Sequence, residues 1–427
     1  MGMNRRLSAS WTLFILTGLN LVNYLDRFVL NAVRTPMADD FHISYGDSGR
    51  PVTAFMIGYF VTSPFFGYLG DRVSRKWLIA AGIFVWSLGT VLTGLAAGFA
   101  MLLWCRVLVA LGEASYATIS PSLISDVYGK ERRNNALTIF YVAIPVGSAL
   151  GYIVGGEVSA HLGWRYAFIW AGLPGLLLAL VLLPFAEPRR GESDGPAGEA
   201  LGKPSPRDVL SLFGRPDYIL VVWGYAAYTF ALGAFAFWGP TFLETVHGLP
   251  TNHADRFFGG VMVVMGLVGT LLGGFVATAW QKRHPAGYAR MLGLSVLVSA
   301  PLAFIALLAA NRYVSMTLIG ASMFFMFLCT GPVNTLIIET VPLNLRASAM
   351  AISIFMIHLF GDMWSPEIVG RLADHWNHDV HLAMMILPVA LLVAAVLWLA
   401  LAIKMARPVR ATGVPKDREL DVPASTP

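Results

Sequence analysis

The stretch LNLVNYLDRFVL, Leu19 to Leu30, belongs to a continuous apolar run that covers residues 9–34. A helix of about twenty apolar residues crosses the roughly 30 Å of hydrocarbon in a bilayer, so this run predicts a membrane span. The run also contains Asp26 next to Arg27, two charges that hydrocarbon does not tolerate without partners. The stretch therefore predicts both a membrane protein and a polar site inside it.

Runs of the same kind recur to the end of the chain. Of its 427 residues, 56% are hydrophobic and only 13% are charged. We predict twelve spans with these bounds: 9–34, 50–70, 77–97, 99–124, 134–160, 164–186, 217–246, 255–280, 288–309, 313–340, 346–373 and 379–405. Lipid offers a backbone no hydrogen-bond partners, and the runs lack the alternation typical of barrel strands. The predicted fold class is an all-α membrane protein with twelve transmembrane helices.

Basic residues gather in alternate loops between these spans. Short cytoplasmic loops accumulate Lys and Arg, so we expect these loops and both termini to be cytoplasmic. The basic residues concerned are Arg5, Arg6, Arg72, Arg75, Lys76, Lys130, Arg132, Arg133, Arg189 to Arg215, Lys282, Arg283, Arg290, Arg346, and Lys404 to Arg418. The net charge of +5 then reflects topology in a cell membrane and predicts no nucleic-acid partner. MNRR leads directly into a first span longer than a signal-peptide core, so no cleavable signal is expected.

Several classes of chemistry have no basis in the sequence. The two cysteines, Cys105 and Cys329, lie alone in separate spans and predict neither a disulfide framework nor a metal site. The chain has no H-E-x-x-H motif, no phosphate-binding glycine loop and no nucleophile with a nearby base. We therefore expect no enzymatic activity and no cofactor.

The chain divides into two halves that echo each other. A segment rich in Gly, Pro and charge, residues 187–216, predicts a cytoplasmic linker between a first half (1–186) and a second half (217–405), with a tail at 406–427. GYLGDRVSRK from Gly67 aligns without gaps on GFVATAWQKR from Gly274, and SDVYGKERRNNAL aligns on IETVPLNLRASAM. Such duplication is typical of transporters whose binding site lies between the halves near the membrane midplane.

Four motifs resemble those of a known family. GYLGDRVSRK resembles the G-x-x-x-D-[RK]-x-G-R-K signature between spans two and three of the major facilitator superfamily, with Ser74 in place of the usual glycine. NYLDRF, RVLVALGEASYATISPSLISD and HLFGDMWSPEIVG together are similar to the Spinster family. The resemblance implies two pseudo-symmetric six-helix halves, a monomer, and proton-linked movement of lysolipids and sphingosine-1-phosphate. It also implies that spans 1, 4, 7 and 10 line a central cavity.

Buried charges in spans 1 and 4 are the main candidates for a site. Asp26 lies roughly 13 Å below the end of its span, and Arg106 falls at a similar depth in span 4. Because the resemblance implies that spans 1 and 4 line the same cavity, Asp26, Arg27 and Arg106 are expected to meet across it. Glu113 comes seven residues after Arg106, on the same helix face and about 10 Å deeper.

These charges suggest a proton switch. Burial favours the neutral form of a carboxyl group and a nearby arginine favours the charged form, so a proton can switch between them. Our hypothesis is that protonating Glu113, with Asp26 as second candidate, loosens its hold on Arg106. Arg106, with Arg27 beside the site, then binds an anionic head group, because a guanidinium suits phosphate by its bidentate geometry. A fixed interhelical salt bridge is the structural alternative.

The sequence of the second half predicts that its side of the central cavity is apolar. Within spans 7 and 10, the stretches LVVWGYAAYTFALGAFAFWG and MFFMFLCTGPVNT contain no charge but many aromatic residues and Met, which favours an amphipathic substrate. Tyr225, Tyr228 and Phe235 share a rough helix face and are the candidate substrate-binding residues; packing between helices is the alternative. In span 11, Asp362 follows His358 by four residues, so the two are expected to pair. We expect no metal there, because a third ligand at suitable spacing is lacking.

The loop signature suggests a gate. Gly67 would allow close helix approach, and Asp71 could cap a helix N-terminus across the half interface while pairing with arginine. The basic residues Arg72, Arg75 and Lys76 would take part, or would only set topology. Thr278 stands where the second half would have the counterpart of Asp71, which predicts an asymmetric gate.

The predicted function is a proton-coupled secondary transporter of an amphipathic anionic substrate, a lysophospholipid or a lipid like sphingosine-1-phosphate, working by alternating access. Its partners are expected to be this substrate, protons and the bilayer. Transport of small organic or sugar acids is the alternative within the class. A lipid sensor that does not transport is the alternative from a different class.

Overall fold

The computed structural model describes residues 5–6, 9–70, 73–128, 130–182, 185–186, 206–342 and 345–406. The first half contains six long helices: α1 (Ala9–Ala32), α3 (Tyr45–Gly70), α4 (Arg75–Gly94), α5 (Phe99–Val127), α6 (Lys130–Leu162) and α7 (Trp164–Leu182). A short helix, α2 (Arg34–Phe41), joins α1 to α3. Two short strands, β1 (Arg5–Arg6) before α1 and β2 (Phe185–Ala186) after α7, pair in parallel.

The second half begins with α8 (Pro206–Leu210) and the short helix η2 (Ser211–Gly214). Its long helices are α9 (Pro216–His247), α10 (Thr251–Gln281) and α11 (Gly287–Leu308). Three further spans are each interrupted: α12 (Arg312–Phe327) with α13 (Thr330–Glu339), α14 (Arg346–Ile357) with η4 (His358–Asp362) and α15 (Ser365–His375), and α16 (Val380–Met384) with α17 (Ile386–Ala406). The helical segments confirm the twelve-span, all-α fold class. Residues 187–205 of the predicted linker and the tail beyond Ala406 lie outside the described residues.

Each of the three interruptions is followed by a proline. A proline ring clashes with the carbonyl group four residues earlier, which breaks or distorts a helix there. Pro332, Pro366 and Pro388 lie four residues after Leu328, Asp362 and Met384, and the helical pattern changes at each of these positions. In the span that contains Pro366 the change is a π-helical turn, η4, closed by a hydrogen bond from Met363 N to His358 O of 3.1 Å.

Hydrophobic composition agrees with a membrane location. In the described part of the chain, ten helical segments are long and apolar enough to cross a bilayer, and α7 adds a shorter apolar segment, Trp164–Leu180. Large apolar side chains are exposed on these helices, among them Phe14, Trp104 and Phe275 at 68%, 74% and 74% exposure. A bilayer can cover such side chains, whereas water could not do so without cost.

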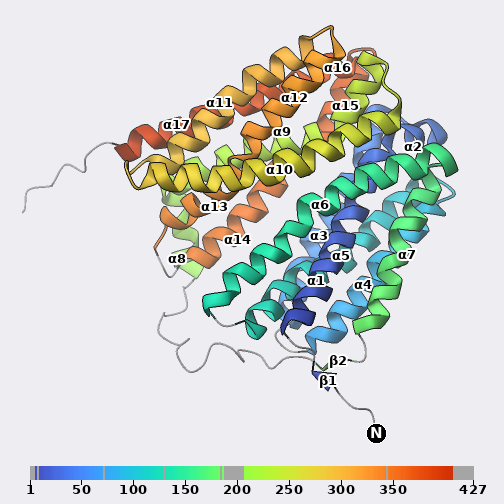
Figure 1. The fold of residues 1–427 in the computed structure, drawn as a ribbon, viewed down its shortest axis with the longest axis horizontal. Helices are drawn as coiled ribbons and strands as arrows, with labels where there is room; N and C mark the ends of the chain where they lie inside the picture. The colour runs from blue at the N-terminus through green and yellow to red at the C-terminus, as the bar shows by residue number, and fades with distance from the viewer. Residues whose placement is uncertain are drawn as a thin grey trace, which may run out of the picture.

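The helices form two bundles that meet along a few elements. In the first half α1 packs on α6, and α4 packs on α5 and α7; in the second half α17 packs on α9 and α11. The halves meet mainly where α6 packs on α10 and α3 packs on α15. Figure 1 shows the first half in blue to green, the second in light green through yellow to red, and the two sets of helices diverging from the end near α2, α15 and α16.

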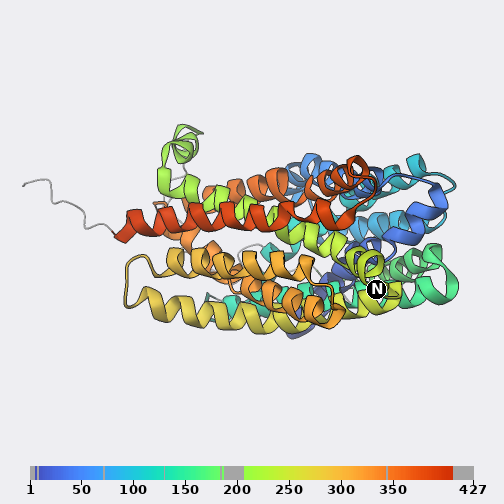
Figure 2. The same ribbon diagram turned by 90° about the horizontal axis from the view of Figure 1, so that it is seen from above.

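We call this end, with α2, the first turn of α3 and the last turn of α15, the α2 end. The first turn of α1 and the last turn of α17 lie toward the other end, where Lys404 Nζ contacts Asp217 Oδ1 at 2.6 Å. In Figure 2 the second-half helices run nearly parallel, and α8 and η2 (light green) project from the bundle near the end of α17 (red). Contacts between the halves are therefore concentrated toward the α2 end, which bears on the site described next.

Candidate charged site between the halves

Four charged side chains from α1 and α5 gather inside the first half. Asp26 and Glu113 are fully buried and Arg106 is 1% exposed, while 21% of the Arg27 side chain is exposed. Phe55 of α3 contacts both arginines, at 5.3 Å from the Arg106 guanidinium carbon and 4.7 Å from that of Arg27. The structure thus brings together all four charged residues that the sequence singled out.

Glu113 binds Arg27 rather than Arg106. Arg27 Nη2 lies 2.5 Å and Arg27 Nε 3.2 Å from Glu113 Oε2, so the ion pair joins α1 to α5. The sequence hypothesis gave this role to Arg106, which shares a face of α5 with Glu113. Seven residues separate them by about 10 Å along the axis, whereas Arg27 comes alongside Glu113 from the neighbouring helix. The depth at which α1 packs beside α5 is set by the tertiary structure, and this depth places Arg27 next to Glu113.

Arg106 remains incompletely bonded. Its Nε and Nη1 atoms are buried without a hydrogen-bond partner, and Asp26 and Glu113 are the carboxylates that interact with it electrostatically. Asp26 Oδ2 accepts a hydrogen bond from Thr90 Oγ1 of α4, a partner that sequence reasoning missed. Asp26 Oδ1 and Glu113 Oε1 have no partner. Buried polar atoms without partners are uncommon in proteins and point to a place where water or a ligand binds.

The charges balance only when both carboxylates are ionised. Two arginines and two carboxylates then sum to zero, and adding one proton to either carboxylate leaves a net positive charge. A positive charge in a place of low dielectric attracts an anion more strongly than it would in water. Protonation of either carboxylate would therefore favour the binding of an anionic group at the same position.

Aromatic rings surround Arg27. Its guanidinium carbon lies 5.1 Å from the ring centre of Tyr24, 4.7 Å from that of Phe55 and 5.7 Å from that of Tyr59. At these distances each ring attracts the cation while presenting an apolar surface. Tyr24, Phe55 and Tyr59, which the sequence analysis did not single out, give the charged site an apolar rim. Phe55 and Tyr59 are four residues apart in α3, a spacing that places them on one face.

The predicted pair in span 11 forms and faces this cluster. His358 Nδ1 lies 2.9 Å from Asp362 Oδ1 and 3.1 Å from Asp362 Oδ2. His358 interacts electrostatically with Arg27 and Asp362 does so with Tyr24, so the second half reaches the first here. Both residues belong to the π-helical turn η4, a feature that is frequent at functional sites. In the described part of the chain, no three His, Cys, Asp or Glu side chains are grouped to hold a metal ion.

The candidate aromatic residues of span 7 lie deeper than a lining position. Tyr228 and Phe235 are 2% and 1% exposed in the core of the second half, and Tyr228 donates a hydrogen bond to Met326 O at 2.9 Å. These positions agree with helix packing, the alternative that the sequence left open. Tyr225 is half-buried, with its ring centre 6.0 Å from that of Tyr228.

The candidate gate is only partly described. Asp71 and Arg72 lie outside the described residues. Gly67 belongs to the last turn of α3, and Arg75, 4% exposed, begins α4. Lys76 follows, with Nζ 5.1 Å from the Trp77 ring. The burial of Arg75 differs from the exposed position expected of a residue that only sets topology.

At the α2 end a different aspartate makes the contact that the sequence predicted for Asp71. Asp374 of α15 accepts hydrogen bonds from Tyr45 N at 3.0 Å and Gly46 N at 2.7 Å, the first amides of α3. A carboxylate is favoured at a helix N-terminus, where the amides have no partner within the helix. Nearby, Thr53 Oγ1 donates to Glu367 Oε2 at 3.1 Å. Capping across the halves therefore occurs, at this end, through the second half.

Arg34 ties the halves together at the same end. This fully buried residue begins α2 and donates hydrogen bonds from Nε to Thr241 Oγ1 of α9 at 2.8 Å and from Nη1 to Ser48 Oγ at 3.3 Å. From Nη2 it donates to Thr35 Oγ1 at 2.9 Å. Its guanidinium carbon lies 4.5 Å from the Trp238 ring. In the sequence Arg34 only marked the end of the first span, because no local pattern reveals its partner on α9.

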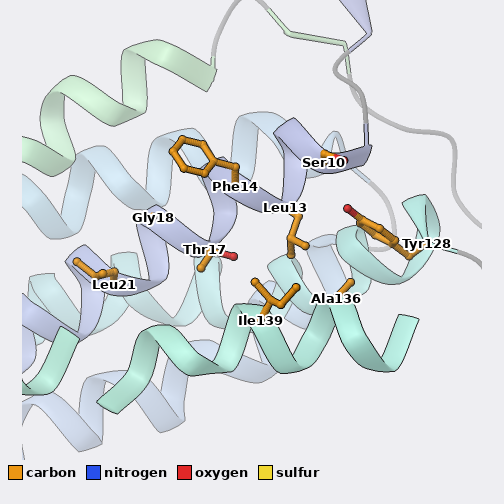
Figure 3. Close-up of a pocket in the computed structure, with 9 residues that line it drawn as sticks. All are labelled: Ser10, Leu13, Phe14, Thr17, Gly18, Leu21, Tyr128, Ala136 and Ile139. Atoms are coloured by element: carbon orange, nitrogen blue, oxygen red, sulfur yellow. The ribbon is translucent and has the colours of Figure 1, made fainter. Parts of the chain in front are cut away.

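An apolar pocket of about 640 Å³ lies between α1 and α6. The lining residues are all uncharged: Ser10, Leu13, Phe14, Thr17, Gly18, Leu21, Tyr128, Ala136 and Ile139. Figure 3 shows Leu13 and Thr17 of α1 directed toward Ile139 of α6. Thr17 Oγ1 is buried without a hydrogen-bond partner, and the space beside Gly18 is open. The pocket suits a hydrocarbon chain with an occasional polar group.

Known proteins of similar sequence and fold agree on one family. The Major Facilitator Superfamily model matches residues 16–366. The protein spinster of Drosophila melanogaster is 34% identical over 382 residues, covering 87% of this chain and 63% of its own length, so the chain spans just under two thirds of that relative. The probable sphingolipid transporter spinster homolog 2 of Arabidopsis thaliana is 31% identical over 423 residues, covering 90% of this chain and 85% of its own length.

A solved structure shares the fold. The crystal structure of a bacterial homologue of the human lysosomal transporter Spinster, in an inward-facing and unoccupied conformation, superposes with a TM-score of 0.82. The match covers 94% of this chain and 99% of that chain at 24% sequence identity, which shows the fold alone. Together with the sequence matches, these findings make the chain a member of the major facilitator superfamily of transporters and, within it, of the Spinster family.

Proposed function

We propose that this protein is a proton-coupled secondary transporter that moves an amphipathic anionic lipid, a lysophospholipid or a lipid like sphingosine-1-phosphate, by alternating access. The central observation is Arg106: it is buried, two of its nitrogens have no hydrogen-bond partner, and two carboxylates with unpartnered oxygens lie in the same cluster. A guanidinium with free donors suits the oxygens of a phosphate group.

Proton coupling follows from the charge balance of this cluster. Binding an anion beside Arg106 while Asp26 and Glu113 both stay ionised would leave a net negative charge away from bulk water. One proton restores neutrality, so anion and proton binding favour each other. Glu113 is the first candidate for the proton, because protonation would break its ion pair with Arg27 and free a second guanidinium for the head group.

The preference for a lipid rests on the apolar surroundings of the charges. The aromatic rim of Tyr24, Phe55 and Tyr59 and the pocket between α1 and α6 both offer surface to a hydrocarbon tail. The name of the Arabidopsis relative, a probable sphingolipid transporter, supports the same substrate class. A small sugar acid would use the charges but not the apolar surface.

Alternating access is supported by the uneven contact between the halves. At the α2 end the halves are joined by a hydrogen bond that Arg34 donates and by two that Asp374 accepts, while the helices diverge toward the other end (Figure 1). The distribution of basic residues puts both termini in the cytoplasm, so the site would be open toward the cytoplasm. We further propose that the protein acts as a monomer in a cell membrane, with residues 187–216 as linker.

The test is proton flux into liposomes that contain the purified protein. Lysophospholipid, sphingosine-1-phosphate or a small sugar acid is added, and the internal pH is followed. Glu113→Gln is compared with Asp40→Asn, a matched control in which an exposed carboxylate, 2.5 Å from Arg165 Nη1, loses its charge. We expect lipid-triggered flux in the native protein and in Asp40→Asn, and at least about tenfold less in Glu113→Gln.

Other outcomes would change the proposal in defined ways. Flux with the sugar acid alone would keep proton coupling and replace the lipid. Saturable lipid binding without flux would favour a sensor. Full activity with an unaltered pH dependence in Glu113→Gln would remove Glu113 from the mechanism.

A further inference from the structure

A second buried carboxyl group lies outside the charged cluster. Asp255, in the first turns of α10, is fully buried, and neither Oδ1 nor Oδ2 has a hydrogen-bond partner. Gly156 of α6 lies directly against it: a Cβ atom built on this glycine would come within 2.6 Å of Asp255 Oδ2 and 2.9 Å of Asp255 Cβ. The carboxyl group is therefore enclosed where the two halves meet.

The charged groups around Asp255 cannot satisfy it when it is ionised. Its electrostatic neighbours are Glu244 of α9, Arg34 of α2 and Glu157 of α6, together with the Tyr152 hydroxyl of α6. On its own helix, His253 and Arg256 are exposed, and Arg256 Nε binds Glu157 Oε1 at 2.6 Å. The surrounding charge is therefore mixed, and the only buried cation among these neighbours is Arg34.

The positive charge of Arg34 is already compensated by the carboxylate of Glu244. Its Nη2 donates to Thr35 Oγ1 at 2.9 Å, and Thr35 Oγ1 donates in turn to Glu244 Oε2 at 2.8 Å. Its other hydrogen bonds go to the hydroxyl groups of Thr241 and Ser48. One guanidinium linked to one carboxylate is neutral, so a second ionised carboxylate at Asp255 would be an uncompensated buried charge, which proteins avoid.

We infer that Asp255 is a second proton-binding site of this transporter, one that holds a proton while the α2 end is closed and releases it to water when the halves separate there. A carboxyl group in contact with water is ionised at neutral pH. Separation of α6 from α10 would let water reach Asp255, and closure would expel that water again. Closing the α2 end therefore takes up a proton. Low pH favours the closed form and high pH favours the open form.

This inference rests on the alternating access of the proposed function, but on neither its substrate nor Glu113. Asp255 lies in the opposite half from Glu113 and Asp26. Its protonation would depend on whether the α2 end is closed or open. A proton bound there would be exchanged in every cycle from the side on which the α2 end opens. The transporter would then have one proton site in the charged cluster of α1 and α5 and a second one at the α2 end.

The test measures the opening of the α2 end directly, without substrate. Spin labels are attached to Ala160→Cys on α6 and Val246→Cys on α9, two exposed positions on opposite halves, while the buried Cys105 and Cys329 are left in place. Distances between the labels are recorded in lipid nanodiscs from about pH 5 to about pH 8.5. Asp255→Asn is the main variant, Asp255→Ser repeats it if the first variant is poorly folded, and Asp40→Asn is the matched control at the same end.

We expect the closed-to-open ratio of the native protein to fall as the pH rises, by up to about tenfold per pH unit for one coupled proton. Asp255→Asn should stay closed over the whole range, and Asp40→Asn should behave like the native protein. A native ratio that does not change with pH, or an Asp255→Asn variant that keeps the native dependence, would overturn the inference. Failure of lipid-triggered flux with these expected distances would instead count against the proposed substrate.

Discussion

Asp26 and Arg27 are neighbours in the chain, but their side chains leave α1 about 100° apart and meet different partners. Asp26 accepts a hydrogen bond from the neutral hydroxyl of Thr90, whereas Arg27 forms an ion pair with Glu113. Arg106, on the same helix as Glu113, keeps two nitrogens without a partner. At the residue scale, then, the guanidinium that is available to a ligand is that of Arg106.

The first prediction concerns the shape of this cation. Arg106→Lys keeps the positive charge but replaces a planar fork with a point charge that cannot form two parallel hydrogen bonds to a phosphate. Losing one hydrogen bond between charged groups corresponds to about ten- to a hundredfold in affinity. We expect kcat/KM for a phosphate-bearing lipid to fall by that factor in a liposome uptake assay.

Arg165→Lys is the matched control for this substitution. Arg165 pairs with Asp40 at the surface and is 37% exposed, so its replacement should leave uptake unchanged. Equal uptake by Arg106→Lys and Arg165→Lys would mean that the fork of Arg106 does not bind the substrate.

At the scale of single elements, prolines shape the second half. The three interrupted spans each change pattern four residues before a proline, and the π-helical turn η4 is one of these places. The turn packs closely on α9: a Cβ atom on Gly361 would lie 2.9 Å from Ala226 O and still nearer to the Thr229 hydroxyl. The position of His358 and Asp362 therefore depends on a glycine between them.

The second prediction tests this packing. Gly361→Ala should push η4 away from α9, lower the free energy of unfolding by about 1–3 kcal/mol and displace the His358–Asp362 pair. Thermal unfolding of the purified protein, followed by fluorescence, gives the shift in Tm. Transport activity is measured on the same preparations.

Gly260→Ala provides the control within a helix. Nothing lies within 4 Å of a Cβ atom built at Gly260 in α10, so the added methyl group should leave Tm unchanged or raise it. If both alanine variants unfold at the same temperature, close packing of η4 on α9 is not the cause of the expected loss.

At the scale of the whole molecule, the α2 end is closed by polar contacts between helices far apart in the chain. Arg34 reaches Thr241 of α9, and Asp374 of α15 caps the first turn of α3. These hydrogen bonds exist only while the halves touch at this end. They therefore favour the conformation in which the α2 end is closed.

The third prediction is that Arg34→Gln opens this end. The substitution replaces the guanidinium that donates to Thr241 of α9 and contacts the Trp238 ring, its two contacts with the second half, and a hydrogen bond from a charged group contributes about 1.5–3 kcal/mol. The ratio of open to closed molecules should rise at least tenfold, read from the distance between labels at Ala160→Cys and Val246→Cys. Arg165→Gln breaks an ion pair within the first half at the same end and should leave the distances unchanged. An unaltered distribution in Arg34→Gln would show that Arg34 does not keep this end closed.

Much of this fold could be predicted from the sequence. All twelve predicted spans coincide with helical segments, although α3 begins at Tyr45 and α6 at Lys130, about one turn earlier than expected. The four charged residues of α1 and α5 and the pair His358–Asp362 were identified by their presence in apolar runs. The assignment of Tyr225, Tyr228, Phe235 and the gate residues to functions stays a prediction.

The sequence by itself determined the class of protein, the number of spans, the family and the identity of the buried charges, because hydrophobicity, proline position and motifs are properties read along the chain. Only the tertiary structure decided that Glu113 binds Arg27, that Arg34 and Asp374 join the halves, and that Asp255 is enclosed by Gly156. These pairings depend on the rotation and depth of each helix against its neighbours. Rotation and depth result from packing between residues far apart in the chain, 86 positions for Arg27 and Glu113 and 329 for Tyr45 and Asp374, and no single helix contains that information.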